Sequence, residues 1–132
     1  MRELTSHKVN GLNEALKIQV LDEPGPGNAC HRYQIEWREV AEPARAEPAR
    51  RLFHGTVHIN FQNGPIGEAG VNGISNEALL AIVEDRLLGF QSAVYACREN
   101  EIALTKLQEC LMWLHARTRD RLVRGVEGTT AK

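Results

Sequence analysis

A regular series of leucines constrains the fold of this chain more than any other feature. The series has spacings of three, four and three residues, at Leu104, Leu107, Leu111 and Leu114. Residues at these spacings lie on one side of an α-helix and resemble the apolar seam of a coiled coil. Because glycine commonly ends a helix, Gly125 is the expected stop. The sequence therefore predicts one long helix whose apolar stripe must be covered by another element.

A second helical pattern precedes the long helix. Ser75 is a typical N-cap residue, and the helical pattern extends to about Gln91. A short turn through residues 92–96 then joins two helices, which predicts a helical hairpin. The apolar face of the shorter helix comprises Leu79, Leu80, Ile82, Val83, Leu87 and Phe90. This helix is too short to cover a partner of roughly 40 Å, at about 1.5 Å per residue. Because the uncovered part includes Trp113, we expect a homo-oligomer.

The first half of the chain has a different hydrophobic period. Apolar side chains occupy alternate positions in three segments, at residues 15–23, 31–40 and 53–62. This alternation indicates half-buried β-strands. The alternation in the third segment is broken near Gly55. Glycine and proline clusters bound these segments. We therefore predict a small antiparallel sheet in this half of the chain.

The two periods together predict an α+β architecture. A β-rich part at residues 1–73 precedes a helical hairpin at residues 74–132, and a chain of 132 residues has the size of a single domain. The pentapeptide repeat "AEPARAEPAR" at residues 41–50 contains prolines, which cannot donate to a strand ladder. We interpret it as an exposed, poorly ordered connection between two strands.

Charge and cysteine usage exclude several classes of protein. The formal net charge is −1, whereas proteins that coat duplex DNA or RNA carry a large positive excess. The cysteines Cys30, Cys97 and Cys110 lack CxxC spacing, so neither a disulfide framework nor a zinc ribbon is indicated. No segment has the pattern of a signal peptide or a membrane span. We therefore expect a soluble intracellular protein without a membrane partner.

Four arginines follow the leucine seam. Steps of four and three residues place Arg117, Arg121 and Arg124 on one stripe, with Trp113 one turn earlier, whereas Arg119 points elsewhere. Guanidinium groups bind phosphate oxygens through paired hydrogen bonds, which suggests a nucleotide phosphate site. A solvated helix end that complements the macrodipole is an equal alternative. The same dipole disfavours anions at this end, so a phosphate site would need a neighbouring subunit.

A second candidate lies at the corner of the hairpin. Phe90 ends the first helix and Asn100 lies in the first turn of the second, so a ring and an amide could stack on and read a base. Alternatively, Phe90 covers the core and Asn100 caps the helix. Asn100 and Thr118 lie roughly 27 Å apart along one helix. A small nucleotide could contact both only if two chains pack antiparallel.

The remaining polar motifs are weaker. The loop "PGPGNACHRY" offers glycine amides with Asn28, His31 and Arg32, but it contains neither GxxxxGK(S/T) nor GxGxxG. His54 and His58 have HxxxH spacing on a strand without a third ligand, so a metal site is not favoured. No nucleophile–histidine–acid arrangement is apparent. We therefore expect neither catalysis nor a cofactor.

A family resemblance accounts for the hairpin. The segments "GPIGEAGVNGISNEALLAIVEDRL", "FQ" and "ACRENEIALTKLQECLMWLHARTRDRLVRGVEGT" resemble the C-terminal hairpin region of the phage Thoeris anti-defence family. The resemblance covers about residues 62–129. Residues 15–40 match in outline, through "EPGPGNACHRY". A shorter, all-helical anti-CBASS sponge family shares the hairpin pattern.

The resemblance implies non-enzymatic sequestration in the cytoplasm of an infected bacterial host. Members of the family act as sponges that bind cyclic ADP-ribose isomers between subunits without cleaving them. Members also assemble into hexamers, and some bind cyclic trinucleotides at a separate site. The expected partners of this chain are therefore a cyclic nucleotide messenger and further copies of itself, as a dimer or hexamer.

The resemblance also assigns site residues. Phe90 and Asn100 would contact cyclic ADP-ribose, and Arg117 and Thr118 would bind from the end of the long helix of another subunit. The further contacts it suggests are Arg121 and Arg124 for phosphate, and Asn28, His31 and Arg32 in the glycine loop. Two other classes of function remain open: an enzyme that cleaves the nucleotide, and a nucleic-acid or protein interaction module that uses the basic helix end.

Overall fold

The chain forms two compact units. The structure is a computed structural model that describes residues 1–38 and 54–132. The first unit ends at Phe61 and the second begins at Gln62. The boundary therefore precedes the one expected at residues 73 and 74. That all 132 residues form a single domain stays a prediction.

The predicted connection at residues 41–50 lies outside the described residues. The backbone N–H of Gln62 donates to the carbonyl of Ile74 at 2.9 Å. This bond joins the start of the second unit to the residue just before its first long helix. The segment between them therefore belongs with the helices.

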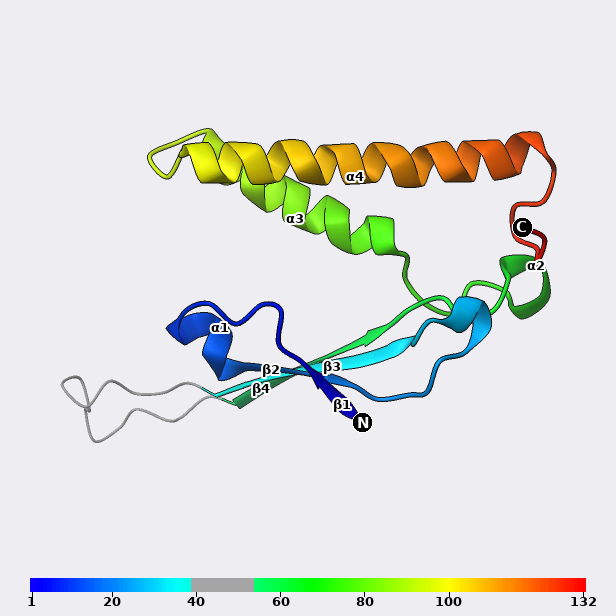
Figure 1. Cartoon of the computed structure of the whole chain (residues 1–132), viewed down its shortest axis with the longest axis horizontal. Coiled ribbons are helices and arrows are strands. Elements are labelled where there is room, and N and C mark those ends of the chain that lie inside the picture. The colour runs from blue at the N-terminus through cyan, green and yellow to red at the C-terminus, as the bar shows by residue number, and fades with distance from the viewer. Residues whose placement is uncertain (39–53) are drawn as a thin grey trace. The chain divides into compact units, whose positions relative to one another are not determined.

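The first unit contains a four-stranded antiparallel sheet with the strand order β1–β2–β3–β4 (Figure 1). Its strands are β1 (Arg2–Leu4), β2 (Leu16–Val20), β3 (Arg32–Arg38) and β4 (His54–Asn60). The last three confirm the predicted strands. The alternation pattern did not identify β1, because a strand of three residues is too short to show a period.

Cross-strand apolar pairs hold the centre of the sheet. Ile18 lies opposite Ile35, and Val20 lies opposite Tyr33. Such directly opposed pairs are the main stabilising contacts of an antiparallel ladder. Val20 is 1% exposed, and the Tyr33 ring packs edge-on against Phe61 with centroids 5.6 Å apart. The small core of this unit therefore gathers around the end of β2.

Gly55 breaks the alternation without breaking the strand. It lies within β4 and is paired with Trp37 of β3. A Cβ atom at Gly55 would lie 1.9 Å from Cζ2 of the Trp37 indole, which is far inside van der Waals contact. The glycine therefore leaves space for the indole of its cross-strand partner, an arrangement known for glycines in sheets.

The connections in this unit contain two short helical segments that the sequence analysis did not predict. Helix α1 (Gly11–Ala15) precedes β2, and its N-cap Asn10 accepts the backbone N–H of Asn13 at 2.9 Å. The 3-10 turn η1 (Pro26–Asn28) lies between β2 and β3. Segments of three to five residues are too short for a helical hydrophobic period to be visible.

The second unit contains three helices. They are α2 (Ile66–Ala69), α3 (Asn76–Gln91) and α4 (Arg98–Val123). Ser75 is the N-cap of α3, and its hydroxyl accepts a backbone N–H of the first turn at 3.1 Å. Gly125 follows α4 with a φ of 72°, the left-handed conformation that ends many helices. Both predicted helix limits are therefore confirmed.

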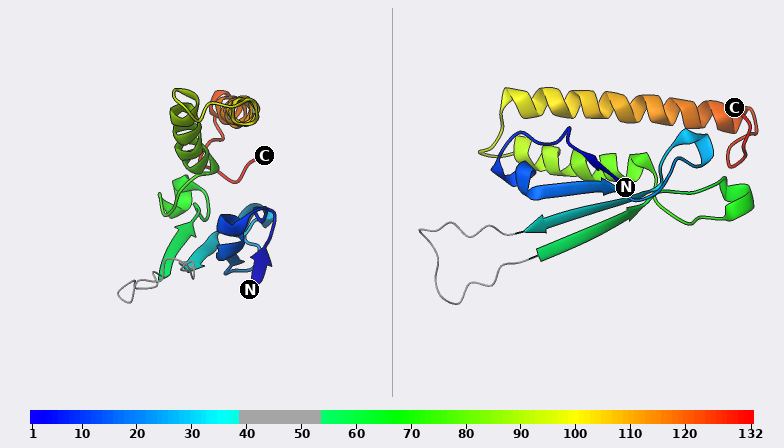
Figure 2. Two further views of the ribbon diagram at one scale, coloured as in Figure 1. Left: turned by 90° about the vertical axis from the view of Figure 1, so that its left-hand side faces the viewer. Right: turned by 60° about the horizontal axis from the view of Figure 1, so that its bottom comes forward.

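Helices α3 and α4 pack as the predicted hairpin (Figure 2). Leu111 of the leucine seam is buried, and the other three seam leucines are half-buried. In contrast, Trp113 is 65% exposed and Ile82 is 60% exposed. The expected uncovered apolar surface is thus present, whereas the homo-oligomer stays a prediction. Within the described residues, no helix combines the length and apolarity needed to span a membrane.

A network of amide side chains fixes the segment before α3. The side-chain oxygen of Gln62 accepts the backbone N–H of Asn72 at 2.9 Å. Asn72 accepts the backbone N–H of Asn63 and donates to its carbonyl, both at 2.8 Å. Asn72 thus imitates a strand pairing across the loop. These bonds satisfy backbone groups that a loop without regular structure would leave unpaired.

Candidate functional site

The hairpin corner carries an aromatic cluster at the end of α3. The rings of Phe90 and Tyr95 make an edge-to-face contact, with centroids 6.2 Å apart and an interplanar angle of 87°. The guanidinium carbon of Arg86 lies 5.5 Å from the Phe90 ring centroid. Phe90 is 38% exposed and Tyr95 is 71% exposed. The predicted stacking residue is therefore reachable from solvent and is held by two neighbours.

Two side chains close the turn between α3 and α4. The Gln91 side-chain oxygen accepts the backbone N–H of Cys97 at 3.0 Å. Cys97 is the N-cap of α4, and its sulfur accepts the backbone N–H of Asn100 at 3.4 Å. These contacts bring the end of α3, with Phe90, to the same end of the hairpin as Asn100. The alternative that Asn100 caps the helix is wrong, because Cys97 has that role.

Arg117 and Thr118 lie toward the other end of α4. Arg117 is exposed and Thr118 is half-buried. No hydrogen bond or ion pair engages the Arg117 guanidinium within residues 1–38 and 54–132. At about 1.5 Å per residue, Asn100 and Thr118 are separated by roughly 27 Å along α4. Within one chain the structure therefore places Phe90 and Asn100 at the same end of the hairpin, but it does not bring either of them to Arg117.

Arg121 is engaged inside the second unit. Its side chain is 7% exposed, and its Nε donates to a Glu127 carboxylate oxygen at 3.0 Å. Its Nη atoms donate to the carbonyls of Val126, Thr129 and Ala131 at 2.9, 3.1 and 2.6 Å. A guanidinium has five N–H donors, and these contacts use most of them. Arg121 therefore anchors residues 126–131, and its contact with a ligand phosphate stays a prediction.

Arg124 is also paired. Its Nε donates to Asp120 at 2.9 Å, one helical turn earlier, and its Nη1 donates to the carbonyl of Lys132. Both side chains of the ion pair are partly exposed, so solvent weakens the attraction. A phosphate at Arg124 would have to compete with Asp120. Of the three arginines predicted on one stripe, Arg117 is the one whose guanidinium is open to a ligand.

The segment anchored by Arg121 also touches α2. The backbone N–H of Gly67 donates to the carbonyl of Gly128 at 3.0 Å. A Cβ atom at Gly67 would lie 2.9 Å from that oxygen, and Gly128 has a φ of 78°. The two glycines therefore permit a close backbone approach that larger residues would prevent. The C-terminal segment is thus attached at both α4 and α2.

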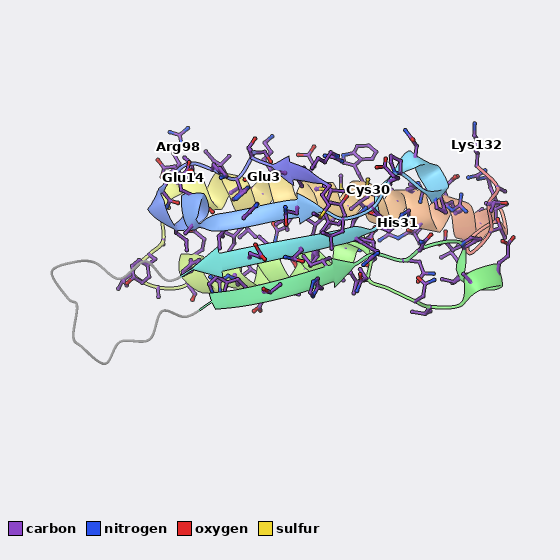
Figure 3. All side chains as sticks on the ribbon, turned by 90° about the horizontal axis from the view of Figure 1, so that it is seen from below. Glu3, Glu14, Cys30, His31, Arg98 and Lys132 are labelled. Carbon is purple, nitrogen blue, oxygen red and sulfur yellow. The ribbon has the colours of Figure 1, made fainter. Side chains whose placement is uncertain are left out.

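A carboxylate organises the glycine loop of the first unit. Asp22 accepts the backbone N–H of His31 at 3.0 Å and that of Arg32 at 3.1 Å. His31 lies directly before β3 (Figure 3). Its ring lies against Gly25, because a Cβ atom added to that glycine would be 3.4 Å from Nδ1 of His31. His31 is 7% exposed, whereas Asn28 and Arg32 are exposed. These three predicted ligand residues therefore share one loop, and their ligand contacts stay predictions.

Asp22 gives the loop a pH dependence. Burial by itself would raise the pKa of Asp22, but the backbone hydrogen bonds from His31 and Arg32 and the nearby charge of His31 outweigh it, so the pKa is lowered from 3.8. A carboxyl group whose pKa is lower in the folded chain than in the unfolded chain stabilises the fold at pH values above its ordinary pKa. This stabilisation is lost as the pH falls through the folded-state pKa.

Asp22→Asn is therefore expected to lower the urea midpoint at pH 7. The difference from the wild type should shrink below about pH 4, because protonation weakens the same bonds in the wild type. Urea titrations of both proteins at pH 7 and pH 3 measure this change. Glu23→Gln, one residue along the loop, is the control. A difference between wild type and Asp22→Asn that is constant with pH would contradict the assignment.

The described histidines and cysteines form no cluster. No group of three or more His, Cys, Asp or Glu side chains that could hold a metal ion occurs in the described part of the chain. His58 contacts the Gln34 side-chain oxygen at 3.1 Å. The side chain of His54, its partner in the HxxxH pattern, lies outside the described side chains. Cys30, Cys97 and Cys110 are free.

Three features of the candidate site were missed by the sequence analysis. Arg86 lies one helical turn before Phe90, and this i, i+4 spacing was a visible signal. The sequence pattern assigns Tyr95 only to a turn. No sequence signal joins Glu127 to Arg121, because the reversal of the chain after Gly125 cannot be read from spacing within a helix.

Comparison with known proteins identifies the hairpin. The model of the family described as "Acb2/Tad1, hairpin domain" matches residues 54–119, half of the chain. The chain is also 55% identical over 74 residues to "Thoeris anti-defense 1" of Bacillus phage SBSphiJ7. That alignment covers 56% of this chain and 52% of the relative, so the chain spans about half the length of this relative.

The matched region contains both ends of the candidate site. Residues 54–119 include four of the predicted ligand residues: Phe90, Asn100, Arg117 and Thr118. Arg121 and Arg124 lie after the end of the matched region. The resemblance noted in the sequence is confirmed by the family model and by the relative. The chain belongs to the Acb2/Tad1 hairpin-domain family.

Proposed function

We propose that this chain is a phage anti-defence protein that sequesters cyclic ADP-ribose-type signalling nucleotides and so blocks Thoeris immunity. The observation that carries the proposal is the family match over the hairpin, which includes Phe90, Asn100, Arg117 and Thr118. The name of the Bacillus phage relative supports the anti-defence role. The proposed partner is a small cyclic nucleotide, with cyclic trinucleotides as a second ligand class.

The chemistry of the corner fits one part of such a ligand. An exposed ring offers a stacking surface to a base, and an amide can donate to and accept from a base edge. Phe90 is 38% exposed, and Asn100 lies at the same end of the hairpin. These two residues would bind the base.

The far end of α4 fits the other part. Arg117 is exposed, and its guanidinium could form paired hydrogen bonds with a pyrophosphate. The helix dipole opposes an anion at this end, so additional groups must contribute. Because roughly 27 Å separates the two ends, the complete site would form between two copies, with the corner of one chain beside Arg117 and Thr118 of another. The exposed Trp113 and Ile82 supply apolar surface for such an assembly.

We further propose that the chain binds the messenger without cleaving it. Inhibition by mass action needs only tight binding and slow release. The chemistry described above provides stacking, amide and guanidinium groups, which are sufficient for binding.

A release experiment tests the proposal. The purified protein is mixed with cyclic ADP-ribose and its glycocyclic isomers, and with cyclic trinucleotides in parallel. Unbound nucleotide is removed, and the protein is heated. Mass spectrometry is expected to recover intact ligand, and the solution mass is expected to exceed that of one chain. A hydrolysed product would favour the enzyme alternative, and no retained ligand would reject sequestration.

A further inference from the structure

We infer that Arg86 of α3 is a further residue of the messenger site, where it serves as the charged partner of Phe90. The inference rests on the proposed function and extends it to a residue that the sequence pattern did not single out. Arg86 lies one helical turn before Phe90, and its guanidinium carbon is 5.5 Å from the ring centroid. This distance is within the range of an attractive cation–π contact.

The contact joins two kinds of chemistry that a nucleotide needs. The ring offers an aromatic surface, and the guanidinium over one face of it offers planar N–H donors and a permanent positive charge. Cyclic ADP-ribose carries a base and a pyrophosphate that are joined through a ribose. A cation over one face of the Phe90 ring can therefore contact the phosphates of a ligand whose base stacks on the other face.

The charge of Arg86 is available for a ligand. Within residues 1–38 and 54–132, no carboxylate lies within salt-bridge distance of its guanidinium, and the residue is exposed. By contrast, Arg121 is paired with Glu127 at 3.0 Å and Arg124 with Asp120 at 2.9 Å. An anion at Arg86 would replace water rather than an internal carboxylate. Of these arginines, Arg86 and Arg117 can thus bind phosphate without breaking an existing ion pair.

The ring that Arg86 contacts is held before any ligand arrives. Tyr95 packs against Phe90 with centroids 6.2 Å apart, from the turn that follows α3. The turn itself is fixed by the bond from Cys97 to Gln91 at 3.0 Å. A side chain that is already positioned loses less conformational freedom on binding. Tyr95 is therefore a positioning residue, whereas Arg86 touches the ligand.

Titration of variants with cyclic ADP-ribose isomers tests the inference. Calorimetry at two salt concentrations measures the Kd of wild type, Arg86→Gln and Arg86→Lys. Arg119→Gln is the matched control, because it removes the same charge from an exposed position on α4. We expect Arg86→Gln to weaken binding roughly tenfold at low salt and less at high salt, as for a lost contact with a charged group. Arg86→Lys should be intermediate, and Arg119→Gln should stay within about twofold of wild type.

The outcomes separate this inference from the proposed function. If wild type binds and Arg86→Gln binds equally well, Arg86 is not a ligand residue and the proposed function stands. An equal loss for Arg86→Gln and Arg119→Gln would assign the effect to net charge and overturn the inference. If wild type binds none of the isomers, both the function and the inference fail. Far-ultraviolet circular dichroism checks that each variant is folded, and Arg86→Lys keeps the charge should Arg86→Gln unfold.

Discussion

Arg117→Ala is expected to weaken binding of the cyclic ADP-ribose messenger by roughly 30-fold or more while leaving the fold unchanged. Removing one partner of a charge-assisted contact at an interface costs about 2–5 kcal/mol, and about 1.4 kcal/mol corresponds to a tenfold change in Kd. The Arg117 side chain is exposed, so its removal creates no cavity. Calorimetric titration of the purified variant measures the loss.

Asn100→Ala provides an independent test at the other end of the site. Its backbone N–H bonds to the Cys97 cap, and this bond is kept in the variant. The loss of the amide should therefore reduce binding without unwinding the start of α4. Arg119→Ala, on another side of the same helix, is the control for net charge. Normal binding by both Arg117→Ala and Asn100→Ala would show that the residue assignment is wrong, even though the family membership stands.

Arg121→Ala is expected to lower the free energy of unfolding by about 3 kcal/mol. The guanidinium is 7% exposed and holds Glu127 and three carbonyls of the C-terminal segment. Truncating one member of a buried ion pair typically costs about 3–5 kcal/mol, because the partner groups are left unpaired. Glu127 is 34% exposed, so the lower end of this range applies.

Urea unfolding followed by circular dichroism measures this loss. Arg124→Ala is a matched control on the same helix, and it should cost less than about 1 kcal/mol because its partner Asp120 is 65% exposed. Glu127→Gln should fall between the two, since the three carbonyl contacts remain. Limited proteolysis of Arg121→Ala should also cleave within residues 126–131 more rapidly. Equal destabilisation by Arg121→Ala and Arg124→Ala would contradict the anchoring role.

The helical hairpin was predictable because its signals are local. The spacing from Leu104 to Leu114 reports which side of a helix is apolar, and the seam leucines are buried or half-buried as expected. Ser75 and Gly125 mark helix limits through their own backbone and side-chain preferences. The three longer strands were visible through their alternation, and the short β1 was not.

The candidate site was predictable only in part. The placement of Phe90 and Asn100 at one corner followed from the lengths of two helices and one turn, and the bond from Cys97 to Gln91 agrees with it. The shared stripe of Arg117, Arg121 and Arg124 also followed from helical spacing. Spacing could show that Asp120 and Arg124 are four residues apart on one helix, but not that Arg121 pairs with Glu127, which lies beyond the end of the helix.

The sequence by itself therefore determined the periodicity of each segment, the limits of the long helices and the family resemblance. The tertiary structure decided the partners: Trp37 over Gly55, Cys97 as the cap of α4, and Glu127 beside Arg121. The physical reason is that periodicity depends on neighbours along the chain, whereas a charge or a ring is satisfied by whatever group the folded backbone brings within a few ångströms.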